Sequence, residues 1–225
     1  MNQLVIKKPE RQFAHYEVIK DPAWEASRLQ QRGEYGLVRD IRNGRKALVR
    51  YLPEKHFSTN RIFRFKNQLR LLAKIKTGSF LAPVDSGHQN GYVFCAQEII
   101  SYPTLAEYFS NTGRNCLDLE RVLDLAHNLL SVLQEVHKTG CVLGTLQPSS
   151  IYYDGQRAAL NCPGPWDFLQ PSGEEPQAIE FAEYASPELA GSIDQDVGPS
   201  SDLYSFGVLL YRVLAGRTPY QGNQV

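Results

Sequence analysis

The spacing of the apolar residues changes near residue 100, and this change limits the fold more than any other feature. Before it, short apolar runs alternate with turn residues, and Asn43-Gly44 between two such runs is a strong hairpin signal. After it, apolar residues recur at helical spacing over 118–138 and again over 201–215. A strand-rich half followed by a helical half predicts an α+β fold in two parts.

The first half is predicted to consist of strands and one helix. Apolar residues at helical spacing predict an amphipathic helix over 61–76. Residues 80–86 and 91–100 have the composition of strands, and the glycines and polar residues over 87–91 predict the turn that joins them.

The second half is predicted to be mainly helical. Thr104 is a residue type that caps helices, which predicts a short helix from there to Phe109. One broad apolar stripe over 118–138 predicts a long helix packed in a core. The stripe comprises Leu119, Val122, Leu123, Ala126, Leu129, Leu130, Leu133 and Val136. After a surface loop over 162–200, residues 201–215 are apolar nearly all round and predict a fully buried helix.

The charge balance excludes some partners. Lys plus Arg and Asp plus Glu number 24 each, so the net charge is zero. This balance gives no electrostatic reason to expect nucleic acid or an anionic membrane as a partner. The 225 residues are 42% hydrophobic, which suffices for one large domain or two small lobes with a core.

The cysteines and the first residues bear on the compartment. Cys95, Cys116, Cys141 and Cys162 form no C-x-x-C pair, so neither a zinc site nor a disulfide framework is expected. The start, MNQLVIKKPERQF, lacks the apolar core of a signal peptide, and no apolar run reaches the ~18 residues of a membrane helix. We therefore expect a cytoplasmic protein with no membrane span in this segment.

Three segments occur in an order that resembles a known family. Residues 136–151 read VHKTGCVLGTLQPSSI, residues 184–188 read YASPE, and residues 201–222 read SDLYSFGVLLYRVLAGRTPYQG. In order, they resemble the catalytic loop, the end of the activation segment and the central buried helix of protein kinases, most of all the bacterial serine/threonine kinases. The resemblance implies a bilobal fold with a small β-rich N-lobe and a mainly helical C-lobe.

The N-terminal half resembles kinases more loosely. Residues 31–38, QRGEYGLV, are similar to the glycine-rich loop with its first glycine replaced by Gln31. Arg50 occupies the position of the strand lysine, and Gln68 that of the helix glutamate that pairs with it. An ion pair of the family is therefore replaced by a pair that can form a hydrogen bond at best.

The resemblance places neutral residues where kinase chemistry needs charge. The catalytic-loop base corresponds to Thr145, whose hydroxyl is no base near neutral pH. The phosphate-contacting lysine corresponds to Gln147. The two metal ligands correspond to Ser150 and Cys162, and a thiol is a poor ligand for Mg²⁺. Placing Asn161 at the second metal position restores an oxygen but no charge.

The glycine-bearing strands have two interpretations: they line a nucleotide pocket, or they form a simple hairpin. The candidate lining of the pocket comprises Gly33, Gly36, Val38 and Arg50. Arg50 is the cation placed to face phosphate, and it is explained as well by a structural role beside Glu34 or Gln68. We expect no metal and no required cofactor, and if a nucleotide binds, ATP without Mg²⁺.

The positions that shape the kinase fold keep their residue types. We interpret His137 as structural, and Asp202 as an acceptor of backbone hydrogen bonds that braces the catalytic loop, as the resemblance implies. Cys162 has no adjacent basic residue, so an inert thiol is favoured over a redox sensor.

The resemblance also divides the chain. It implies an N-terminal extension over 1–15, an N-lobe over 16–100, and a partial C-lobe over 101–225 that is truncated after the central helix. In the family, Glu188 pairs with an arginine beyond that point. We therefore expect a fragment of a longer chain or a lobe completed by a partner, an unpaired Glu188, and marginal stability or self-association of this piece.

These expectations favour a pseudokinase domain with a regulatory, scaffolding or protein-interaction role and no phosphotransfer activity. The alternative is a weak or unconventional ATP-binding serine/threonine kinase, and a remnant that only supports neighbouring domains is a third reading. A protein partner or the rest of a longer chain is expected as the contact, and nucleic acid is not.

Overall fold

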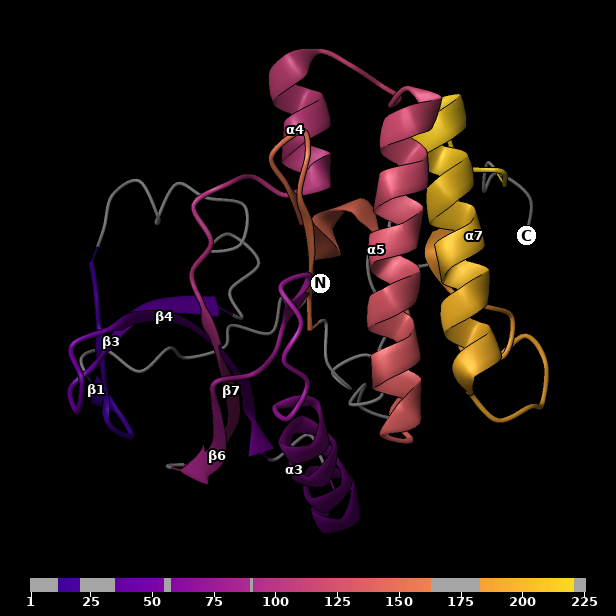
Figure 1. Ribbon diagram of the computed structural model, residues 1–225. Helices are drawn as coiled ribbons and strands as arrows, with labels where there is room; N and C mark the ends of the chain where they lie inside the picture. The colour runs from indigo at the N-terminus through magenta and orange to yellow at the C-terminus, as the bar shows by residue number, and fades with distance from the viewer. Residues whose placement is uncertain (1–11, 21–34, 55–57, 90, 163–182, 221–225) are drawn as a thin grey trace, which may run out of the picture. The chain divides into compact units, whose positions relative to one another are not determined.

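The computed structural model describes residues 12–20, 35–54, 58–89, 91–162 and 183–220 (Figure 1). These residues fall into two compact units. The first holds the described residues up to Ala73 together with Pro83–Ile99, and the second holds Lys74–Ala82 and the described residues from Ile100 onward.

The first unit is built on a six-stranded sheet in which every neighbouring pair is antiparallel. The strand order is β1-β2-β3-β4-β7-β6. The strands are β1 (Gln12–Phe13), β2 (Tyr16–Val18), β3 (Tyr35–Asp40), β4 (Lys46–Pro53), β6 (Asp85–Gln89) and β7 (Tyr92–Glu98). One core cluster lies on this sheet and comprises Tyr16, Val38, Ala47, Val49, Phe94 and Ala96.

The hairpin predicted at Asn43-Gly44 is confirmed. β3 pairs with β4 from Tyr35 opposite Arg50 to Arg39 opposite Lys46. Gly44 has φ +74, a left-handed conformation that glycine adopts without steric cost, and its N–H donates to the Asp40 carbonyl at 2.7 Å.

The predicted turn over 87–91 is wrong in part. Gly87 lies inside β6, opposite Phe94, whose ring comes within 2.7 Å of the position that a Cβ would occupy. This glycine therefore makes room for a core ring rather than for a turn. The positive φ lies at Gly91, +76, just before β7.

Helix α3 (Thr59–Leu72) confirms the predicted amphipathic helix but ends four residues earlier than the predicted Lys76. The Ser58 hydroxyl accepts a hydrogen bond from the Arg61 N–H at the start of the helix. At the end, the Ala73 N–H donates to the Leu69 carbonyl and closes the last turn. The buried face carries Ile62, Phe65, Leu69 and Leu72.

The second unit combines a small sheet with helices. The sheet has the order β5-β9-β8, with β5 (Phe80–Leu81), β8 (Ile151–Tyr153) and β9 (Ala158–Asn161). The helices are α4 (Leu105–Thr112), α5 (Leu119–Lys138), the 3₁₀ turn η2 (Pro148–Ser150) and α7 (Pro199–Ala215). The predicted Thr104 cap is confirmed, because its hydroxyl accepts from the Glu107 N–H while the Glu107 carboxylate accepts from the Thr104 N–H.

Helices α5 and α7 lie side by side (Figure 1), and the Leu117 N–H joins their ends by donating to the Val213 carbonyl at 2.8 Å. The predicted stripe on α5 is wrong in part, because Leu119, Leu123 and Leu130 are exposed. Leu125 and Val132, which the apolar spacing left out, are buried in their place. An apolar residue type alone does not fix the face that a helix turns toward its neighbours.

The prediction of a fully buried helix over 201–215 is also wrong. The buried face of α7 includes Phe206, Leu209 and Val213, whereas Leu203 and Leu214 are about half exposed. The sequence is apolar on both faces, but neighbours among the described residues cover only one. None of the helices in the described residues is long and apolar enough to cross a membrane.

Candidate functional site

A buried carboxylate on α7 holds the loop that follows α5. Asp202 accepts hydrogen bonds from the N–H of Leu143, at 3.0 Å to Oδ2, and from the N–H of Gly144, at 2.6 Å to Oδ1. His137, at the end of α5, places its Nε2 2.8 Å from Asp202 Oδ2. Both sequence-based interpretations are confirmed: Asp202 accepts backbone hydrogen bonds and braces this loop, and His137 is a partnered structural residue.

The environment of Asp202 explains why these contacts are needed. Its side chain is fully buried, and this burial raises the pKa of the carboxyl above its ordinary value. The hydrogen bonds from Leu143, His137 and Gly144 act in the opposite direction because they favour the ionised form. Gly144 has φ +91, so the backbone conformation that aims its N–H at Asp202 is one that favours glycine.

Two serines of α7 bind the segment before the helix, and one of them, Ser205, also contacts the same loop. The Ser205 hydroxyl donates to the Tyr184 carbonyl at 2.6 Å and lies 3.3 Å from the Gly144 carbonyl. The Ser201 hydroxyl donates to Glu188 Oε1 at 2.5 Å and accepts from the Gly198 N–H at 3.1 Å. Sequence reasoning missed both serines, because a serine within an apolar helix carries no signal of the partner it will find.

Among the described residues no cation forms an ion pair with Glu188, but its carboxylate has a neutral partner, because the Ser201 hydroxyl donates to it. The Ser201 hydrogen bond is the main cause that holds the pKa of Glu188 below its ordinary value. Ser201 is fully buried and its hydroxyl needs an acceptor, which the nearby carboxylate provides.

The braced loop contains three of the predicted site positions. Thr145 is buried, with 2% of its surface exposed. The Ser150 hydroxyl accepts from the Gln147 N–H at 3.1 Å and donates to the Gln147 carbonyl at 2.7 Å, so it closes the turn η2. Gln147 Oε1 is buried and has no hydrogen-bond partner among the described residues. The structure thus brings Thr145, Gln147 and Ser150 together as neutral groups on one turn.

Cys162 follows β9 at the edge of the described residues. Its side chain is buried, with 2% exposed. Asn161, the alternative candidate for the same role, pairs with Leu81 across β5 and β9, and its side-chain oxygen is buried without a hydrogen-bond partner among the described residues. The described residues contain no group of three His, Cys, Asp or Glu that could hold a metal ion.

The candidate nucleotide residues of the first unit are placed only in part. Gly36 and Val38 are buried in β3 and pair with Val49 and Ala47 of β4. Arg50 and Gln68 are each half-buried, on β4 and α3. Gly33 lies outside the described residues. A nucleotide pocket with this lining therefore stays a prediction.

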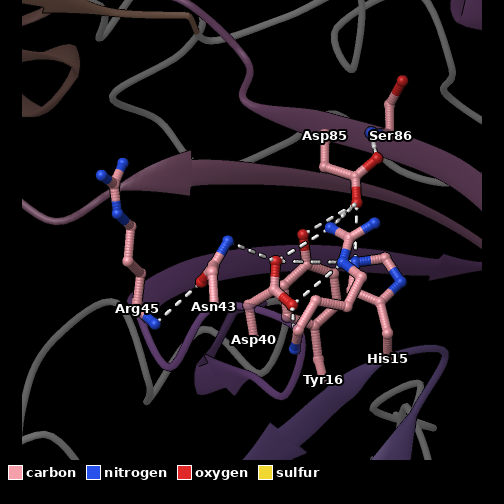
Figure 2. Close-up of polar contacts among 8 residues, drawn as sticks. His15, Tyr16, Asp40, Asn43, Arg45, Asp85 and Ser86 are labelled. Carbon is pink, nitrogen blue, oxygen red and sulfur yellow. Dashed lines mark hydrogen bonds and ion pairs between the residues drawn. The ribbon is translucent and has the colours of Figure 1, made fainter.

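The first unit also contains a polar cluster that sequence reasoning missed (Figure 2). His15 Nε2 lies 2.8 Å from Asp85 Oδ2, and the Tyr16 hydroxyl donates to the same oxygen at 2.9 Å. The Arg42 side chain donates twice to Asp40, from Nε at 3.0 Å and from a terminal nitrogen at 2.8 Å. These hydrogen bonds are the main cause that lowers the pKa of Asp40 to about 2. Burial, followed by the charge of Asp85, raises the pKa of Tyr16 well above its ordinary value.

Part of this cluster had a signal in the sequence. Asp40 and Arg42 flank the hairpin turn at Asn43-Gly44, and an acidic and a basic residue two positions apart beside a turn can meet. Asp85 comes from β6, 45 residues after Asp40, and it lies near them because β6 and β7 complete the same sheet. The nearness of Asp85 to Asp40 therefore follows from the strand order of the sheet and not from a local sequence signal.

The chain is similar in sequence to bacterial serine/threonine kinases. It is 28% identical over 200 residues to serine/threonine-protein kinase pkn2 of Myxococcus xanthus, an alignment that covers 84% of this chain and 24% of that protein. It is also 28% identical over 178 residues to serine/threonine-protein kinase PknL of Mycobacterium bovis, covering 78% of this chain and 43% of the relative. The chain therefore spans less than half the length of these relatives. No family model matches the chain.

Comparison with solved structures identifies the fold. A crystal structure of the Mycobacterium tuberculosis PknI kinase domain superposes with a TM-score of 0.70 at 19% identity, covering 95% of this chain and 79% of that domain. A second PknI kinase-domain structure gives a TM-score of 0.69 and covers 95% and 77%. The chain has the protein-kinase-like fold, of the α+β class. In sequence the chain is similar to bacterial serine/threonine kinases, and in fold it is similar to a bacterial kinase domain.

Proposed function

We propose that this chain is a pseudokinase domain that acts by binding other protein segments rather than by transferring phosphate. The observation that carries the proposal is the contrast on the loop after α5. Asp202 and His137 brace this loop as the resemblance to kinases implies, yet Thr145 stands at the position of the base.

The chemistry explains why the substitutions matter together. Phosphoryl transfer needs metal ions and cations that neutralise the transferring group and a residue that accepts the hydroxyl proton. Thr145 cannot accept that proton near neutral pH, and loss of a general base typically costs about 10²–10⁴ in rate. The Ser150 hydroxyl is engaged in closing η2 at 2.7 Å, and Cys162 offers a soft ligand where hard Mg²⁺ takes oxygen.

A transfer assay with γ-labelled ATP tests the proposal. The full 225-residue chain, with Mg²⁺ or Mn²⁺ and with protein substrates, is expected to incorporate no label. Incorporation that Thr145→Ala or Cys162→Ala abolishes would show that these residues take part in catalysis. Incorporation that survives both changes would show a transferase with another mechanism, and either result overturns the proposal.

A second candidate is a weak or unconventional ATP-binding serine/threonine kinase. The similarity to proteins named as serine/threonine kinases over 84% and 78% of the chain favours it. Thermal unfolding with ATP, with and without Mg²⁺, distinguishes the two candidates. A kinase is expected to be stabilised by ATP in a way that depends on Mg²⁺, and a pseudokinase is not. Stabilisation by ATP alone is compatible with a pseudokinase that holds nucleotide without metal.

A further inference from the structure

The neutral net charge conceals two segments of opposite sign. Residues 55–84 contain seven Lys and Arg residues and no Asp or Glu. Residues 158–211 contain nine Asp and Glu residues and no Lys, Arg or His. The positive segment includes the whole of α3, so that helix differs sharply from the average of the chain.

Helix α3 presents three of its four cationic side chains on an exposed face. Phe63 is 72% exposed, and Arg64, Lys66 and Arg70 are exposed around it. Since a helix turns once in about 3.6 residues, Phe63 and Arg70 lie on the same side, with Arg64 and Lys66 to either side of them. We call these four residues the cationic face.

No ion pair within the described residues neutralises a cation of the cationic face. α3 itself contains no acidic residue, and the structure records no ion pair of Arg64, Lys66 or Arg70 with any other described residue. Arg70 makes a hydrogen bond to the neutral Asn67 side chain at 3.2 Å. A concentration of like charge around an exposed aromatic ring is costly in isolation and attracts an anionic partner.

The shape of this face selects the kind of partner. The apolar side of α3 is buried against its own unit, so a groove on another protein cannot receive it. The exposed side is convex and can touch a flat anionic surface along its length. Cationic side chains on a helix attract anionic lipid head groups, and an aromatic ring among them inserts at the interface. Nucleic acid is less favoured, because nucleic-acid-binding domains are strongly basic as a whole and this chain is neutral.

We propose that the cationic face of α3 (Phe63, Arg64, Lys66, Arg70) binds reversibly to the surface of an anionic lipid bilayer. The contact is peripheral and electrostatic, and no segment enters the hydrocarbon core beyond the Phe63 ring. The inference stands apart from the proposed pseudokinase function, since it uses none of the residues of the loop after α5.

Vesicle sedimentation with the full 225-residue chain tests this proposal. Phosphatidylcholine vesicles containing phosphatidylserine are expected to bind the chain, and pure phosphatidylcholine vesicles are not. Raising the ionic strength from ~0.01 M to ~0.15 M shortens the screening length from ~30 Å to ~8 Å and is expected to weaken binding. Equal binding to both kinds of vesicle, or binding that is indifferent to salt, would overturn the proposal.

Two sets of matched variants locate the contact. The triple change Arg64→Gln, Lys66→Gln, Arg70→Gln is expected to weaken binding about a hundredfold, at roughly fivefold for each cation removed. The control Arg45→Gln, Arg114→Gln, Arg217→Gln removes the same charge from exposed positions elsewhere and is expected to weaken binding much less. Equal losses in the two triple variants would refute a specific face.

The aromatic ring gives a separate readout. Phe63→Ala is expected to weaken binding up to about tenfold, with unchanged thermal unfolding because the ring is exposed. Unchanged binding in this variant would contradict the insertion of the ring. Binding to duplex DNA at concentrations where the anionic vesicles do not bind would overturn the choice of partner.

Discussion

The residues that brace the loop after α5 differ from the candidate reactive residues on that loop in how far they match the kinase pattern. Asp202 and His137 keep the residue types and hydrogen bonds that fix the loop. Thr145, Gln147 and Ser150, which lie on the loop itself, are neutral, and the Ser150 hydroxyl is engaged with the backbone of Gln147. The shape of a loop depends on the satisfaction of its buried N–H groups, and this requirement persists when the chemistry is absent.

Removing the brace is expected to have the largest effect. Asp202→Ala leaves the buried N–H groups of Leu143 and Gly144 without an acceptor, which is expected to lower the free energy of unfolding by about 2–5 kcal/mol. Urea unfolding of the variant and of the unchanged chain measures this loss. Asp202→Asn keeps one acceptor oxygen and is expected to lose less than half as much.

The Asp202→Ala result can contradict the structural role given to the brace. An Asp202→Ala loss below about 0.5 kcal/mol, the range of ordinary surface substitutions, would show that the loop does not depend on the carboxylate. The Asp202 hydrogen bonds would then be no evidence that the scaffold is retained.

The second contact of the brace region is expected to have a smaller effect. Ser201→Ala removes the hydrogen bond to Glu188 Oε1 and the acceptor for the Gly198 N–H, which is expected to cost about 1 kcal/mol. The pKa of Glu188, followed by NMR titration, is expected to rise toward its ordinary value because the main cause of its depression is gone. A pKa of Glu188 that stays low in the variant would show that Ser201 is not the main cause of the depression.

The pH dependence of stability sharpens the contrast between two buried aspartates. Asp40 has its pKa lowered from 3.8 to about 2, so its contribution is present above the ordinary value and is lost as the pH falls toward 2. Asp202 has its pKa raised, so its contribution is present below the ordinary value and is lost as the pH rises through the folded-state pKa.

Urea unfolding across the acid range measures both contributions by difference. Asp40→Asn is expected to flatten the loss of stability between about pH 4 and pH 2. Asp202→Asn is expected to remove the loss of stability that the unchanged chain shows as the pH rises through the folded-state pKa of Asp202. The same slope in both variants would contradict the assignment of opposite pKa shifts.

The sequence predicted the fold well where local signals act. The hairpin at Asn43-Gly44 and the cap at Thr104 follow from backbone requirements of single residues, and both are confirmed. The role of Asp202 followed from the resemblance to kinases. The faces of the helices were harder, since Leu123 and Leu125 look equally apolar and only neighbours decide that Leu125 is buried.

The candidate site was predicted in part for a similar reason. The neutral residue types at Thr145, Gln147 and Ser150 are visible in the sequence, but the hydrogen bonds between the Ser150 hydroxyl and the Gln147 backbone are not. The contacts of Asp85 with His15 and of Ser205 with Tyr184 need the tertiary fold. The total charge also concealed the cationic face of α3, because an average over the chain cannot report how charge is distributed.

Titration calorimetry with ATP tests whether the proposed loss of metal-dependent chemistry accompanies the intact brace. The experiment compares the full chain in Mg²⁺ with the same chain in a chelator, and uses Asp202→Asn as a control for the state of the brace. The account predicts that Mg²⁺ adds no affinity, because Ser150 closes a turn and Cys162 is a poor Mg²⁺ ligand. Micromolar affinity for ATP that requires Mg²⁺ would contradict the account.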